Sequence, residues 1–105
     1  MLLNEKISDI VDYLLSNLKN YNKEEQILIL KKINYIYQVF FEDDDYGNNF
    51  CILAKINKQI SELYILLNDN ENAKKYDNYY LEFVNKSREV DKTYKHTSIL
   101  FKKGY

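Results

Sequence analysis

Residues 53–84, LAKINKQISELYILLNDNENAKKYDNYYLEFV, decide how this chain folds, because they predict two helices joined by one tight turn. Each half spaces its apolar residues three and four positions apart, which places them on one stripe of a helix. We therefore expect an antiparallel hairpin in which the two stripes meet. The stripe of the first half is Ile56, Ile60, Leu63, Tyr64 and Leu67, and that of the second is Ala73, Tyr76, Tyr80, Phe83 and Val84.

The turn between the two halves is encoded by Asn68, Asp69 and Asn70. Asparagine tolerates left-handed backbone, and both Asn and Asp side chains bond to nearby main chain. Either Asp69 or Asn70 is therefore expected to cap the second helix. Ala73 is small and faces Tyr64 across the turn, which lets the two helix axes approach to about 8–10 Å.

The hairpin resembles a tetratricopeptide repeat (TPR), a helix-turn-helix unit of about 34 residues. Two positions depart from that pattern. Asn57 replaces a bulky aromatic residue, and Tyr80 fills a site that usually holds alanine. These departures favour one repeat-like hairpin over a regular array. The matching positions are Ile60 for the large apolar residue, Ser61 and Ala73 for the small residues, Tyr64 for the aromatic residue, and Asn68-Asp69 for the turn.

The composition is typical of a single all-α domain spanning residues 1–105. The 105 residues are 46% hydrophobic and 30% charged, with no proline and only two glycines. A chain of this length can bury a modest core without disulfides or metal ions. The net charge of −1 argues against a protein that binds nucleic acid on its own, since such proteins carry concentrated positive charge.

Cysteine usage and the N-terminus indicate a cytoplasmic protein. The single cysteine, Cys51, cannot form an internal disulfide and fits a reducing compartment. Glu5 and Lys6 interrupt the apolar residues at the start of the chain, so no secretory signal is predicted. No stretch approaches the ~18–20 apolar residues of a membrane span. We therefore expect no membrane association.

A first helical hairpin is predicted over residues 1–41, with helices at about 3–19 and 24–41 and a polar break at 20–22. The two helices should bury stripes of large apolar side chains. The stripe of the first helix is Leu3, Ile7, Ile10, Val11, Leu14, Leu15 and Leu18, and that of the second is Ile27, Leu30, Ile33, Tyr37 and Phe40.

Two isoleucines of the second helix, Ile29 and Ile36, lie off its stripe and need a second neighbour. That neighbour is either the central hairpin or another subunit. Tyr79 directly precedes Tyr80, and Tyr35 lies two positions before Tyr37. Because Tyr37 and Tyr80 belong to buried stripes, Tyr35 and Tyr79 are expected to face outward. These four residues are candidates for an oligomer interface, and a homodimer is one possible assembly.

Residues 42–49 are predicted to be an acidic loop. A calcium site is one alternative, because oxygen ligands at alternate positions suit this ion, and Asp43 and Asp45 could begin such a loop. However, Gly47 stands one position early for the turn glycine, and Ala54 occupies the twelfth position, where a bidentate glutamate is needed. We therefore favour a solvated connector, and we expect no metal site.

The C-terminal part is predicted to hold the TPR-like hairpin at residues 50–88, a polar connector at 85–94 and a short capping helix at 94–103. Ile99, Leu100 and Phe101 are three consecutive apolar residues close to the end of the chain. We expect this short helix to dock on the preceding one and to shield the open end of the stack. The predicted architecture is thus four long helices in antiparallel hairpins plus a short fifth helix, as in a fragment of a TPR-like α-solenoid.

Three segments of the chain are distinctive: IYQVFFEDDDYGNN at 36–49, LYILLNDNENAKKY at 63–76 and KHTSILF at 95–101. Together they resemble the C-terminal TPR-like region of Firmicute transcriptional regulators of the xenobiotic-response-element (XRE) type, and the similarity covers about two thirds of the chain. In these regulators an N-terminal helix-turn-helix reads DNA. No such DNA-binding domain is recognisable here. The resemblance implies a sensing or oligomerising module, either a fragment of a longer regulator or a free-standing relative.

Enzymatic residues are not predicted. His96 is the only histidine. A catalytic histidine needs a nucleophile and an orienting group that converge on it in space, and we do not expect its neighbours on a terminal segment to do so. Cys51 is interpreted as a small buried apolar residue rather than a redox sensor. No glycine-rich phosphate loop and no paired zinc ligands are present in the sequence. We expect neither an enzyme nor a cofactor.

The expected partner is a peptide or a protein. In repeats of this kind the first helix of each hairpin lines a groove, and this geometry places Lys55, Lys58, Gln59 and Glu62 on the groove side. The two lysines could hold a carboxylate, although a solvated charged face is the alternative. Two functions follow as hypotheses. One is an interaction or oligomerisation module related to a regulator. The other is a stand-alone adaptor or anti-regulator that acts by mixed assembly with a full-length relative.

Overall fold

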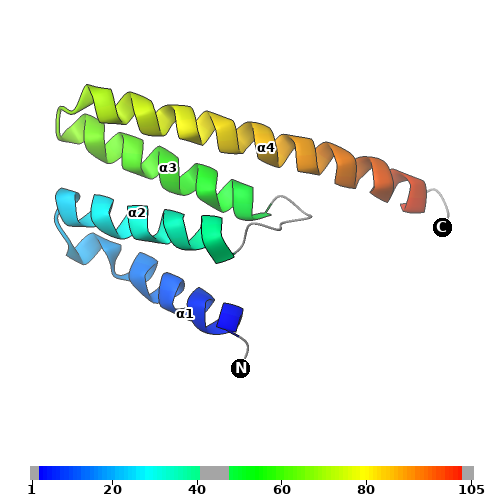
Figure 1. The fold of residues 1–105 in the computed structure, drawn as a ribbon, viewed down its shortest axis with the longest axis horizontal. Coiled ribbons are helices and arrows are strands. Elements are labelled where there is room, and N and C mark those ends of the chain that lie inside the picture. The colour runs from blue at the N-terminus through cyan, green and yellow to red at the C-terminus, as the bar shows by residue number, and fades with distance from the viewer. Residues whose placement is uncertain (1–2, 41–47, 103–105) are drawn as a thin grey trace.

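Over the residues that the structure describes, the fold consists of four α-helices packed side by side in chain order (Figure 1). The computed structural model describes the backbone of residues 3–40 and 48–102 and the side chains of residues 6–39 and 49–89. The helices are α1 (Leu3–Ser16), α2 (Lys23–Phe40), α3 (Asn48–Leu66) and α4 (Asn70–Lys102), and a 3-10 turn, η1 (Leu18–Asn20), follows α1. The described part contains no strand, which confirms the all-α expectation.

Each helix packs on its neighbours in the sequence, with α1 at one edge of the layer and α4 at the other (Figure 1). The contact between α3 and α4 is by far the most extensive, and α2 packs on α3 from the other side. The α3–α4 hairpin is therefore the most extensively packed part of the described structure. Helix α2 packs against this hairpin, and α1 packs against α2.

The core is formed where the predicted apolar stripes meet. Leu30, Ile33 and Ile60 are completely buried at its centre. Within each helix the buried residues recur three or four positions apart, as the helical period requires. The buried cluster is Val11, Leu18, Ile27, Leu30, Ile33, Tyr37, Leu53, Ala54, Ile56, Ile60, Leu63 and Phe83.

The turn between α3 and α4 is a Schellman motif followed by an N-cap. Asn68 has a φ of 62° and its N–H donates to the carbonyl of Ile65, while the N–H of Asp69 donates to the carbonyl of Tyr64. The Asp69 carboxylate accepts the N–H of Asn72 at 3.1 Å, which confirms Asp69 as the cap of α4. Ser61 links α3 to α4 at the same end of the hairpin, because its hydroxyl donates a hydrogen bond to the carbonyl of Ala73 at 2.6 Å.

The start of α2 carries a cap that the sequence analysis did not identify. Asn22 and Glu25 form a capping box, in which the N–H of Glu25 donates to Asn22 Oδ1 at 2.8 Å and the N–H of Asn22 donates to Glu25 Oε1 at 3.3 Å. At the end of α1, Ser16 and Asn17 bond back to the carbonyls of Asp12 and Tyr13. The helix ends at Ser16 and not at residue 19, and η1 follows it.

The predicted connector at 85–94 and separate capping helix at 94–103 are wrong. Helix α4 is continuous for 33 residues and is longer than the 19-residue α3, so its last turns extend beyond the other helices (Figure 1). The physical reason is that no proline or glycine lies between Asn70 and Lys102, so nothing in the sequence stops the helix. A segment that continues the axis of α4 cannot fold back onto it as a cap.

The last two residues of the acidic loop predicted at 42–49 are helical, because α3 begins at Asn48. Residues 41–47, which include the alternative calcium ligands, lie outside the described residues, as does the side chain of His96.

Candidate interaction surfaces

The four residues predicted to line a partner groove, Lys55, Lys58, Gln59 and Glu62, are all exposed on α3. The two lysines differ in their surroundings. The Lys58 ammonium lies 3.0 Å from Asp77 Oδ1 on α4 and 5.1 Å from the centre of the Tyr80 ring. Hydrogen bonding to Asp77 raises the pKa of Lys58. The Lys58 ammonium is therefore engaged in the contact between α3 and α4. Of the two lysines, Lys55 is the one that lines a hollow.

That hollow lies between α3 and α4 and has a volume of about 350 Å³. Lys55 from α3 and Arg88 from α4 are its two cationic residues, and Tyr80 and Val84 supply apolar wall. We refer to it as the α3–α4 hollow. Its lining is completed by Cys51, Ala54 and Ser87.

Arg88 was not predicted as a site residue, because it falls where the predicted hairpin at 50–88 meets the polar connector at 85–94. The signal was present, because Tyr80, Val84 and Arg88 recur every four residues and so share one face of α4. Helix α4 continues through this region, so the three residues lie on one helical face.

Cys51 was predicted to be buried, and this is wrong. The thiol is exposed at the start of α3, and its Sγ lies 2.9 Å from Ser87 Oγ on α4. The flanking residues Phe50 and Ile52 are half-buried instead. Two apolar neighbours on a helix take the inward positions and turn the residue between them outward.

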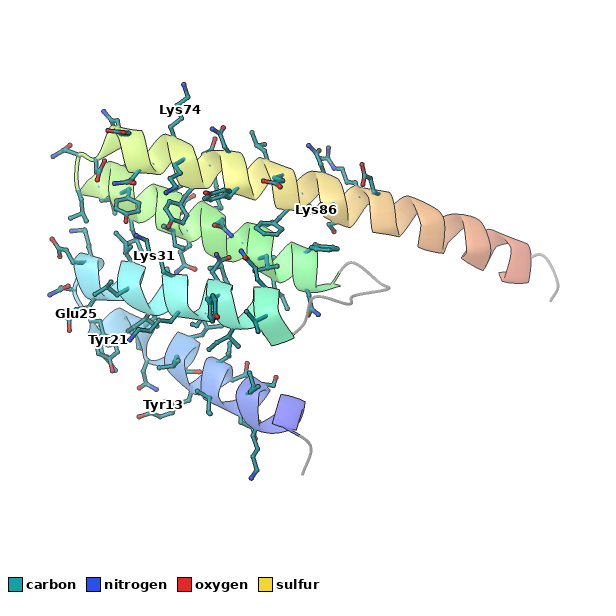
Figure 2. All side chains as sticks on the ribbon, in the orientation of Figure 1. Tyr13, Tyr21, Glu25, Lys31, Lys74 and Lys86 are labelled. Atoms are coloured by element: carbon teal, nitrogen blue, oxygen red, sulfur yellow. The ribbon has the colours of Figure 1, made fainter. Side chains whose placement is uncertain are left out.

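A second cluster joins three helices around one lysine. Lys31 lies where α2 faces α3 (Figure 2), and its ammonium is 5.2 Å from the centre of the Tyr64 ring and 5.3 Å from that of Tyr76 on α4. Tyr79, at 38% exposure, packs edge-on against Tyr76 with 5.5 Å between ring centres. Interaction with Tyr64 is the main cause that raises the pKa of Lys31. The cluster therefore holds a positive charge against aromatic faces, which is a stabilising arrangement.

The outer face of α2 exposes large side chains. Leu28 is 59%, Tyr35 66% and Val39 49% exposed, so the outward position expected for Tyr35 is observed. Ile29 and Ile36 are partly buried and pack against the core. The chain itself therefore covers much of the strip predicted at Ile29 and Ile36. The exposed residues are instead Leu28 and Tyr35, which directly precede them.

Neither a metal cluster nor a membrane-spanning helix occurs in the described part of the chain. No three His, Cys, Asp or Glu residues there are grouped so that they could hold a metal ion. None of the helices, over the residues that the structure describes, is long and apolar enough to cross a membrane.

Comparison with known proteins does not assign a family. No protein-family model, no curated protein and no solved structure matches this chain. The surfaces described above are therefore interpreted from their own chemistry.

Proposed function

We propose that this chain is a non-enzymatic protein-interaction module that binds a peptide or protein partner at the α3–α4 hollow. The observation that carries the proposal is the placement of Lys55 and Arg88, from two different helices, at an otherwise largely apolar depression. Such a site suits a segment that inserts an apolar side chain and places a carboxylate beside the cations. The preferred partner is an acidic segment with an apolar anchor.

The wider setting of the proposal is the resemblance to the TPR-like region of XRE-type regulators. Helices that pack mainly on their sequence neighbours support a repeat-like unit, and the small residues Ser61 and Ala73 meet at the hairpin crossing as that pattern requires. In this proposal the module is cytoplasmic and senses or assembles with a partner, while DNA reading belongs to another domain or protein.

The single cysteine provides a direct test, because Cys51 lines the hollow and is accessible. A synthetic peptide of alternating glutamate and leucine should slow the alkylation of Cys51 by N-ethylmaleimide, followed by mass spectrometry. A matched peptide with lysine in place of glutamate should give no protection, because it repels Lys55 and Arg88.

Charge-reversal variants separate specific docking from general attraction. The double variant Lys55→Glu with Arg88→Glu should lose the protection, whereas Lys19→Glu with Lys74→Glu makes the same change of net charge at exposed positions elsewhere and should keep it. Equal loss in both double variants would show that only the overall charge matters and would refute the proposed site.

A further inference from the structure

The outer face of α2 carries a stripe with the spacing of a coiled-coil seam. Leu28, Lys32, Tyr35 and Val39 are separated by four, three and four residues, which is the alternation of the core positions in a heptad repeat. All four side chains are exposed. We call this stripe the α2 seam. In the described structure α1 and α3 pack on α2 without covering it.

The α2 seam is complementary to itself when reversed. A two-fold axis between residues 33 and 34 would place Leu28 opposite Val39 and Lys32 opposite Tyr35, and each pairing would occur twice. This is the property that a symmetric dimer interface needs, since every contact from i to j is repeated from j to i. We propose that the chain forms a homodimer in which α2 packs antiparallel on α2 of a second copy.

The electrostatics of the α2 seam decide the orientation. In the antiparallel arrangement the Lys32 ammonium lies against the Tyr35 ring of the second copy, which is a favourable cation–π contact. A parallel arrangement would bring Lys32 against Lys32 and would place like charges together. Within the chain, Lys31 and Lys58 already rest on tyrosine rings in the same manner.

Apolar contacts stabilise the association itself. The pairing of Leu28 with Val39 removes two large exposed side chains from water on each copy. Ile36 flanks the α2 seam and lines a shallow hollow together with Leu28, Lys31, Lys32 and Tyr35, so a side chain of the second copy can enter beside it. The dimer is independent of peptide docking at the α3–α4 hollow, and either proposal can fail without the other.

Light scattering on a sizing column, from low to high micromolar chain, tests the assembly. The wild-type chain should elute with twice the monomer mass at the upper concentrations. Tyr35→Lys should raise the dimer dissociation constant by about tenfold or more, because it gathers four lysines at the α2 seam. Leu81→Lys is the matched control, since Leu81 is 50% exposed on α4, and it should leave the dissociation constant unchanged.

A compensating substitution identifies the orientation. Adding Lys32→Glu to Tyr35→Lys should restore part of the affinity, about threefold or more, because each new carboxylate then faces the new lysine of the second copy. In a parallel dimer the same double variant would oppose like charges and restore nothing. A monomeric wild-type chain, a dimer insensitive to Tyr35→Lys, or an absence of restoration would each overturn the proposal. Circular dichroism of every variant verifies that the helices are intact.

Disulfide trapping measures the pairing directly. In a Cys51→Ser background, Leu28→Cys together with Val39→Cys should form a covalent dimer under mild oxidation. Leu28→Cys alone should not, because antiparallel pairing separates the two copies of position 28 by eleven helical residues, about 16 Å along the axis. That distance exceeds the ~7 Å limit between the Cα atoms of a disulfide. A covalent dimer of the single variant, or none from the double variant, would contradict antiparallel packing.

Discussion

The side-chain amide of Asn57 on α3 donates to Oδ1 of Asn34 on α2 and to the carbonyl of Leu53, both at 2.8 Å. Asn57 is completely buried, and its own Oδ1 has no hydrogen-bond partner among the described residues. A buried acceptor without a partner destabilises the folded state. Asn57, one of the two residues that depart from the repeat pattern, is thus also a polar contact between α2 and α3.

Replacing Asn57 by leucine should therefore leave the stability unchanged or raise the free energy of unfolding by about 1–2 kcal/mol. The substitution removes the unpaired acceptor and keeps a similar volume, and Asn34 is partly exposed, so it can bond to water instead. Asn57→Ala serves as the comparison and should be less stable than Asn57→Leu, because it leaves a cavity. Urea unfolding followed by circular dichroism measures both. A loss of more than about 1 kcal/mol in the leucine variant would show that the Asn34 contact outweighs the orphan acceptor.

The contrast between local and long-range features explains how far the sequence could predict this structure. The turn at Asn68 and Asp69 was predictable, because its hydrogen bonds join residues within one or two helical turns. The Asn34–Asn57 contact was not, since it depends on the register of two separate helices. The unbroken α4 was missed because a polar segment without glycine or proline fits both a connector and an exposed helix.

The candidate surfaces show the same limit. The resemblance to a repeat predicted that Lys55 and Lys58 lie on the groove side of the first hairpin helix, but it could not reveal that Asp77 engages Lys58 from α4. Periodicity identified a second apolar strip on α2 without deciding which residues the chain covers. Ile29 and Ile36 pack inward and Leu28 and Tyr35 remain exposed, because α1 and α3 approach α2 from particular directions.

The left-handed conformation of Asn68 predicts the response of the hairpin turn to substitution. Asn68→Gly should keep or slightly raise stability, since glycine adopts a φ of 62° without steric cost. Asn68→Val should lower the free energy of unfolding by at least about 1 kcal/mol, because a β-branched side chain clashes in this region. Thermal and urea unfolding measure the pair. Equal stability of the glycine and valine variants would mean that the turn adopts another conformation in solution.

Asp69 predicts a dependence on acid pH. Hydrogen bonds from the side chain and the backbone N–H of Asn72 lower the pKa of Asp69. Because the folded pKa lies below the unfolded value of about 4, the contribution to stability is present above that pH and is lost as the pH falls through the folded pKa. Wild-type protein should exceed Asp69→Asn in urea midpoint at neutral pH, and this difference should disappear at low pH. A difference that stays constant from neutral to strongly acid solution would contradict the assignment.

Lys31 predicts the opposite, alkaline dependence. Its pKa is raised, chiefly by Tyr64, so the stability it contributes is fully present below the unfolded pKa of about 10.4 and is lost as the pH rises through the folded value. Lys31→Met keeps the aliphatic stem and removes the charge, and it should therefore be less stable than wild type at about pH 8. The difference should shrink toward about pH 11.5.

Tyr37 affects the alkaline stability of both chains alike. Burial raises the pKa of Tyr37, which makes the folded state of either chain less stable as the pH passes the unfolded pKa of tyrosine, about 10. Comparing the two chains at each pH therefore isolates Lys31. Lys74→Met is the matched control, because Lys74 is exposed on α4 (Figure 2), and it should follow the wild-type curve. If Lys31→Met and Lys74→Met gave the same curve, the three-helix contact of Lys31 with Tyr64 and Tyr76 would contribute nothing to folding.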